Sequence, residues 1–98
     1  MSDDPLHYLE QWYRRQCDGD WEHSYGVELG TLDNPGWKLR IDLVGTDCEG
    51  RQVPRTKADR SDDDWCHVWS DGVRFEAAAG SANLSEMLSA FRSFSAER

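Results

Sequence analysis

The chain has 98 residues and a formal net charge of −8, with 38% hydrophobic and 31% charged residues. This length is typical of one domain, so we expect a single domain over residues 1–98. Five tryptophans and an aromatic content of 11% indicate a folded chain and not a disordered one. The acidic surplus disfavours nucleic acid and anionic membranes as partners and favours basic proteins, although it also serves solubility.

No export or membrane signal is apparent along the sequence. No apolar run approaches the roughly 20 residues of a membrane-spanning helix, and the N-terminus lacks the basic and apolar stretches of a signal peptide. The cysteines Cys17, Cys48 and Cys66 are odd in number and irregularly spaced, which does not suit a disulfide framework. We therefore expect reduced thiols and a cytoplasmic location.

The first predicted element is a helix over residues 4–16. Asp4 is a candidate N-cap, and Pro5 suits the first helical position because its missing N–H would have no partner there. Apolar residues recur on one face at helical spacing: Leu6, Leu9 and Tyr13.

Two strands follow, over residues 24–31 and 37–43. Alternation of apolar and polar residues is clearest in the second, where Trp37, Leu39, Ile41 and Leu43 share one face. Between them, the Asp33-Asn34-Pro35-Gly36 segment is a strong turn signal, because proline presets φ and glycine tolerates positive φ. These strands predict a hairpin with one apolar face.

A polar segment over residues 51–60 contains Pro54, which cannot donate to a strand ladder, so it predicts at best an edge strand. A second hairpin follows, with strands 65–70 and 73–79 joined by an Asp71-Gly72 turn. This turn places Ser70 opposite Val73 and sets the register of the hairpin.

The last element is a helix over about residues 84–96, with Asn83 and Glu86 forming a start that resembles a capping box. Its expected buried stripe comprises Leu84, Met87, Leu88 and Phe91. The element order predicts a two-layer α+β fold. We expect an antiparallel meander sheet of four to five strands, flanked by an N-terminal and a C-terminal helix on its apolar face.

The register of the second hairpin divides its side chains between two faces. Small or apolar residues such as Cys66 and Phe75 mark the core face, so Trp65, His67 and Trp69 point the other way. If both helices cover the core face, these three residues stand on an open surface, where aromatics beside arginine are typical of protein-binding sites. If the sheet curls, or the first helix covers this side, the two tryptophans are ordinary core.

Catalytic and metal-binding signals are weak. Cys17 follows a predicted helix C-terminus and precedes several carboxylates, an environment that raises a thiol pKa, although Arg14 and Arg15 offset this in part. The cysteines and histidines lack the short spacing of zinc modules, and the Asp62–Asp64 run lacks the pattern of a calcium loop. We expect no catalytic residue, metal or cofactor.

Two blocks of sequence carry a resemblance to a known family. Residues 16–23 read QCDGDWEH and residues 32–37 read LDNPGW. With Trp12-Tyr13, Asp63-Asp64-Trp65 and the aromatic hairpin that follows, they resemble the Imm53 family of bacterial immunity proteins over nearly the whole chain. The resemblance is weakest over residues 45–60, and the last helix matches only in pattern.

The resemblance implies a role in polymorphic toxin systems, in which the protein binds and blocks a cognate toxin domain, such as a basic nuclease. An acidic inhibitor would approach such a target quickly. The expected partner is that toxin, with no nucleic acid or membrane, and a weak homodimer is left open. The hypothesis for the toxin-facing surface comprises Asp18, Asp20, Trp21, Glu22, Asp62, Asp63, Asp64, Trp65, His67 and Trp69.

Other interpretations remain at this point. The 16–23 block also suits a structural role, in which Gly19 stops the helix, Asp18 or Asp20 caps amides and Trp21 plugs the core. Some relatives have carried a sulfurtransferase label, so the alternative function is a small thiol enzyme that uses Cys17. A generic adaptor without a toxin is a third interpretation.

Overall fold

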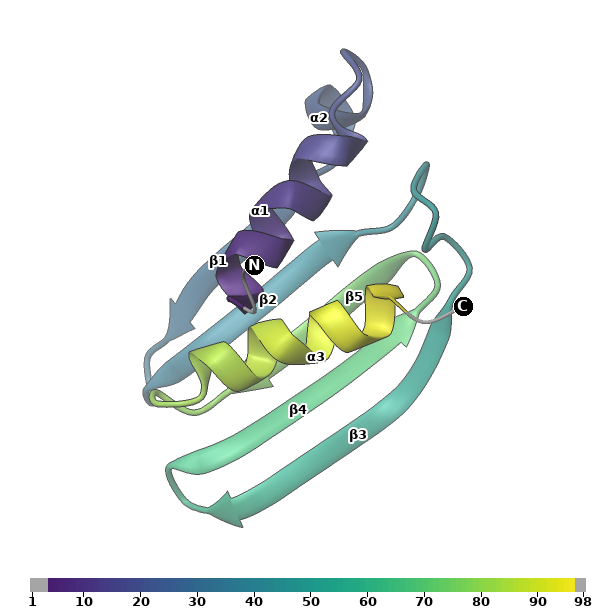
Figure 1. Ribbon diagram of the computed structural model, residues 1–98. Helices are drawn as coiled ribbons and strands as arrows, with labels where there is room; N and C mark the ends of the chain where they lie inside the picture. Colours follow the sequence, from purple (N-terminus) through teal and green to yellow (C-terminus); the bar gives the residue numbers. More distant parts are fainter. Residues whose placement is uncertain (1–3, 97–98) are drawn as a thin grey trace.

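A five-stranded antiparallel sheet and three helices form the computed structural model, which describes residues 4–96 (Figure 1). In chain order the elements are α1 (Pro5–Gln16), α2 (Trp21–Ser24), β1 (Val27–Leu32), β2 (Gly36–Asp42), β3 (Gln52–Ser61), β4 (Asp64–Asp71), β5 (Arg74–Ala79) and α3 (Leu84–Ala96). The predicted α+β class with an N-terminal and a C-terminal helix is confirmed. The short helix α2 was not predicted.

The strand order is β1-β2-β5-β4-β3, so the expected meander is wrong in its connections. In a meander β3 would lie between β2 and β4, where Pro54 would remove a ladder hydrogen bond from the middle of the sheet. In the structure β2 pairs instead with β5, which aligns Leu39 with Ala77 and Ile41 with Phe75. The polar strand β3 is thereby left at an edge, as its proline predicts.

The register of the β4–β5 hairpin is two residues away from the predicted one. Ser70 lies opposite Phe75, not Val73, and the two-residue loop is Gly72-Val73. The Asp71 carboxylate accepts hydrogen bonds from the amides of Val73 and Arg74, at 2.9 Å each, and Gly72 adopts φ +89°. Val73, expected on the core face, is therefore half exposed at the turn.

The connection from β2 to β3 explains this shift. It crosses the end of the sheet, where the Leu43 amide donates to the Val73 carbonyl and the Gly50 amide donates to the Gly72 carbonyl, each at 2.8 Å. Gly50 and Gly72 approach so closely that a Cβ on Gly72 would lie 3.1 Å from the Gly50 Cα. The turn is thus held by a distant segment as well as by its own residues.

Both long helices lie on the same face of the sheet (Figure 1), as expected. The Asp4 carboxylate accepts from the Leu6 amide and caps α1, so the predicted helix start is confirmed. Beneath the helices, Phe91 of α3 packs edge-on against Trp12 of α1 at 5.0 Å between ring centroids and against Phe75 of β5 at 5.2 Å. The core lies between this helical layer and one face of the sheet.

Over residues 4–96, neither α1 nor α3 is long and apolar enough to cross a membrane, and α2 is a single turn.

Candidate functional site

The face of the sheet opposite α1 and α3 carries no helix in the described part of the chain (Figure 1), and we call it the uncovered face. Trp65, His67 and Trp69 lie on this face of β4 and are half-buried by neighbouring side chains. The alternative in which α1 covers them is excluded, because α1 packs with α3 over the opposite face. The register error of two residues leaves Trp65, His67 and Trp69 on the predicted face, because side chains along a strand alternate with a period of two.

Side chains of β3 hold this aromatic row in place. Asp59 lies opposite Trp65, and its carboxylate is 2.6 Å from Nε2 of His67. The His67 ring packs against Trp65 with 5.1 Å between ring centroids. The Arg55 guanidinium lies 4.1 Å from the centroid of the Trp69 ring, a cation–π arrangement. The tryptophans are therefore both accessible and pre-oriented, which lowers the entropy that a partner must overcome on binding.

Two hollows flank the row. One, of about 510 Å³, opens beside Trp65 and is lined by Asp59, Arg60, Ser61, Asp62, Trp65 and His67. The other, of about 290 Å³, lies beside Trp69 and is lined mainly by charged residues of β1, β2 and β5: Glu28, Lys38, Arg40 and Glu76. Arg55, Asp59 and these four residues were not predicted from the sequence as part of this surface. Arg55 and Asp59 reach the row through the pairing of β3 with β4, whereas the place of the other four beside Trp69 depends on the pairing of β2 with β5.

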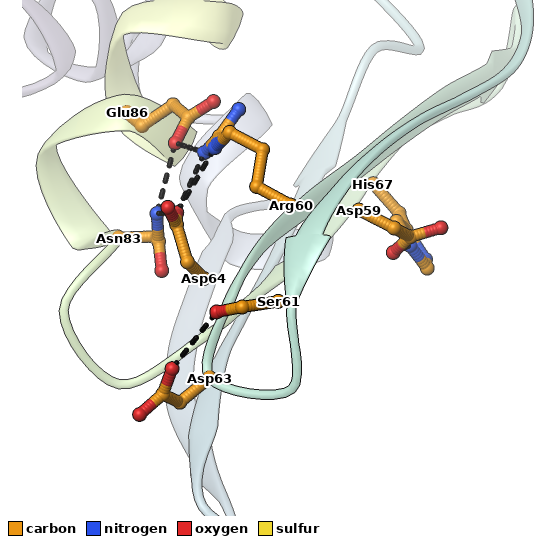
Figure 2. Close-up of polar contacts among 8 residues, drawn as sticks. All are labelled: Asp59, Arg60, Ser61, Asp63, Asp64, His67, Asn83 and Glu86. Atoms are coloured by element: carbon orange, nitrogen blue, oxygen red, sulfur yellow. Dashed lines mark hydrogen bonds and ion pairs between the residues drawn. The ribbon is translucent and has the colours of Figure 1, made fainter.

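Asp64 belongs to the helix side of the sheet and not to the uncovered face. In Figure 2 it lies with Arg60, Asn83 and Glu86, while Asp59 and His67 lie across the strand. Arg60 contacts both carboxylates, with Nη2 at 2.9 Å from Asp64 and 2.5 Å from Glu86, and Asn83 donates to both at 2.9 Å. The hydrogen bonds from Arg60 lower the pKa of Asp64 and of Glu86, and those from Asn83 add a smaller effect in the same direction. The cluster ties the β3–β4 turn to the start of α3.

This cluster predicts a pH-dependent contribution to stability. The lowered pKa values mean that Asp64 and Glu86 stabilise the fold above the pKa of an unfolded carboxyl, about 4, and that this contribution is lost as pH falls through the folded values. Arg60→Gln should therefore lower the urea midpoint at pH 7, and the difference from wild type should shrink progressively below about pH 5.

Arg55→Gln is the matched control, because Arg55 lies on the same strand but packs on Trp69 and not on these carboxylates. Its effect on the urea midpoint should not shrink with acid in this way. An Arg60→Gln effect that stays constant from pH 7 to pH 3 would contradict the assignment.

Residues 17–24 form a tight local structure. Three of the four predicted site residues in this segment make hydrogen bonds to the backbone that stabilise it: Asp18, Trp21 and Glu22. The Asp18 carboxylate accepts from the amides of Asp20 and Trp21, at 2.9 and 3.0 Å, and these bonds, that from Trp21 first, lower its pKa. Glu22 accepts from the amides of Asp18 and Gly19. Trp21 is only 6% exposed, and its indole N–H donates to the Val44 carbonyl at 2.8 Å. Of the four predicted site residues in this segment, Asp20 alone has an exposed carboxylate without a hydrogen bond to any described residue.

The two acidic groups of the predicted surface lie far apart. Figure 1 places α2 at one end of the molecule and the β3–β4 turn at the other. At the turn, Asp62 and Asp63 are exposed, and Asp63 accepts a hydrogen bond from the Ser61 hydroxyl at 3.0 Å. The structure therefore brings Asp62, Asp63, Trp65, His67 and Trp69 near one another, and separates Asp18, Asp20, Trp21 and Glu22 from them.

The three thiols lie in surroundings that do not activate them as nucleophiles, as their burial and hydrogen bonds show. Cys48 and Cys66 are buried, and burial raises the pKa of both thiols, that of Cys66 to about 11. Cys17 is half-buried and its thiol lies 3.4 Å from the Tyr13 carbonyl. Among residues 4–96, no group of three or more histidine, cysteine or carboxylate side chains could hold a metal ion.

A comparison with family models finds one described as Immunity protein 53 (Imm53), matched over residues 6–96. The chain belongs to the Imm53 family. Neither the curated proteins nor the solved structures include a match to it. Membership of Imm53 identifies an immunity protein, and this class implies a toxin as protein partner. The Imm53 match includes the whole β3–β4 region, so the uncovered face belongs to the family domain.

Proposed function

We propose that this protein neutralises a cognate toxin domain by binding it through the β3–β4 part of the uncovered face. The observation that carries the proposal is a pair of half-exposed tryptophans, Trp65 and Trp69, on a sheet face that no described helix covers. Tryptophan and arginine dominate the binding energy of protein interfaces when a partner covers them fully. Together with membership of the Imm53 family, this surface leads us to propose an inhibitor that blocks the toxin's active surface sterically and electrostatically, with no cofactor.

The carboxylates at the Trp65 end of this face suit a basic group of the partner. The hollow beside Trp65 combines an aromatic wall with the carboxylates of Asp59 and Asp62. A lysine or arginine of the toxin can stack on the ring and pair with Asp62, whose carboxylate makes no hydrogen bond or ion pair within residues 4–96. The net charge of −8 adds a long-range attraction that accelerates the encounter. A nuclease domain with a basic substrate groove is a target of this kind.

Affinity capture identifies the partner. The tagged chain is incubated with a lysate of the organism that encodes it, at low and at moderate salt, and bound proteins are identified by mass spectrometry. The proposal expects one large protein with a basic C-terminal toxin domain, retained through moderate salt. Recovery of no toxin at either salt concentration would contradict the proposal.

Reversing one charge tests the orientation of the complex. Asp62→Lys should slow association with the captured toxin domain by roughly 3- to 10-fold at low salt and flatten the dependence of the rate on salt, because it removes attraction at the point of contact. Stopped-flow fluorescence measures both quantities.

Asp20→Lys is the matched control, since the Asp20 carboxylate is also exposed and makes no hydrogen bond or ion pair within residues 4–96, but Asp20 is at the N-cap position of α2, which lies at the opposite end of the molecule. It should change the association rate much less. Equal effects of the two variants would mean that only the total charge matters, and a larger effect of Asp20→Lys would move the contact to the α2 end.

A further inference from the structure

The two edges of the sheet differ in how they resist pairing with another strand. The β3 edge carries Pro54, the basic residues Arg55 and Lys57, and two register shifts against β4. Prolines, charges and bulges of this kind prevent another strand from adding to an edge. The β1 edge has neither a proline nor a register shift, because Val27–Leu32 runs in unbroken register with β2, and its one charged residue, Glu28, is paired with Arg40 of β2. Of the two edges, β1 is the one open to pairing.

Apolar side chains gather beside the β1 edge. Within residues 4–96, five large apolar residues are exposed, and four of them lie on α1, on β1 or just before β1: Leu6, Tyr13, Tyr25 and Leu29. Leu6 is 54% and Leu29 41% exposed. A groove of about 350 Å³ between α1 and β1 is lined by Leu6, Leu9, Glu10, Tyr13, Gly26 and Val27. Apolar surface collected at one edge marks an interaction site.

We propose that β1 pairs antiparallel with β1 of a second copy of this chain, continuing the sheet across a two-fold axis. The axis is perpendicular to the sheet, so both helical layers stay on one side. Leu29 lies opposite Leu39, a core residue, and therefore projects to the helix side. Pairing brings the Leu29 side chains of the two copies together near the axis and covers exposed apolar surface beside β1, which removes that surface from water.

The sequence of β1 is compatible with itself in this arrangement. A two-fold pairing centred on Leu29 or on Gly30 sets Glu28 opposite Gly30 or Leu32, and never opposite Glu28 of the other copy. Glu28 is already paired with Arg40 of β2. Glu10, the one charged residue that lines the groove, lies 3.6 Å from His7. With Glu28 paired and a single carboxylate lining the groove, the edge carries little net charge, which suits a second copy better than it suits a basic toxin.

The net charge of −8 has a consequence for this dimer. Two like-charged copies repel each other, so added salt screens the repulsion and strengthens the association. Binding to a basic toxin has the opposite salt dependence, because salt screens an attraction there. The two interactions can thus be told apart, and the dimer does not depend on the proposed function. It leaves the β3–β4 face of each copy free.

Sedimentation equilibrium of the full chain over a range of concentrations, at 50 and 500 mM salt, tests the proposal. We expect a reversible monomer–dimer equilibrium with a larger dimer fraction at high salt. Leu29→Lys should weaken dimerisation at least about tenfold, because it sets two charges near each other at the two-fold axis. Val73→Lys is the matched control, since Val73 is 50% exposed but lies in the β4–β5 loop, and it should leave the dimer unchanged.

A wild-type chain that stays monomeric at both salt concentrations would overturn the proposal, as would a dimer that Leu29→Lys leaves intact. A monomer whose binding to the captured toxin domain falls on Leu29→Lys, with unchanged thermal unfolding, would assign the edge to the toxin and equally overturn it.

Discussion

Replacing Trp69 by alanine is expected to weaken binding to the toxin domain by about 2 kcal/mol, roughly 30-fold in Kd, while the chain stays folded. Trp69 is half-buried on the uncovered face, where its ring packs with Arg55 and not with the helical layer. Truncation removes a large, pre-oriented contact surface, and little of the core changes. Titration calorimetry measures the affinity, and urea unfolding of the free variant checks its stability.

Trp37→Ala is the matched control for this prediction. Trp37 is also half-buried, but it lies on the helix side, where its indole N–H donates to the Ser81 carbonyl at 3.0 Å and its ring packs against the core. This variant should lose stability and keep its toxin affinity under conditions in which it is folded. Unchanged affinity of Trp69→Ala, or an equal loss in both variants, would contradict the assignment of the uncovered face.

Replacing Phe91 by alanine is expected to destabilise the fold by about 3–5 kcal/mol. Phe91 is fully buried and contacts aromatic rings of α1, β5 and its own helix: Trp12, Phe75 and Phe94. The cavity left by the ring lies where the two helices meet the sheet, so few neighbours can move to fill it. Because a domain of this size has about 5–15 kcal/mol of stability, the variant should be partly unfolded at 37 °C. Urea unfolding followed by tryptophan fluorescence measures the loss.

Leu6→Ala provides the comparison, because Leu6 is 54% exposed on α1. Its effect on unfolding should stay within about 1 kcal/mol when measured at low protein concentration, where self-association does not contribute. A loss below about 1 kcal/mol for Phe91→Ala would mean that the helical layer does not pack on the sheet as described.

Features determined by neighbouring residues could be predicted from the sequence. Asp4 and Pro5 start α1 through their own backbone chemistry, and the Asp33–Gly36 turn needs only its own residues. The face of Trp65 and Trp69 was also predictable, since a register shift of two residues does not exchange the faces of a strand. Local chemistry thus predicts where the helices, strands and turns lie along the chain and on which face of the sheet a strand residue lies.

Features determined by distant residues could not be predicted. The pairing of β2 with β5 depends on a connection over residues 43–51 whose hydrogen bonds to the Gly72-Val73 loop join segments far apart in the chain. The same non-local contacts bring Lys38 and Arg40 beside Trp69. The partners of two side chains are likewise distant in the chain: the Trp21 indole donates to the Val44 carbonyl, and Asp64 accepts a hydrogen bond from Asn83.

Hydroxyl-radical footprinting of the complex with the captured toxin domain tests the central claim most directly. Mass spectrometry compares the oxidation of each tryptophan and tyrosine side chain in the free and the saturated protein. We expect Trp65 and Trp69 to become protected in the complex, while Tyr25, just before the other edge strand β1, reacts as before. Undiminished oxidation of Trp65 and Trp69 in a saturated, inhibited complex would contradict it.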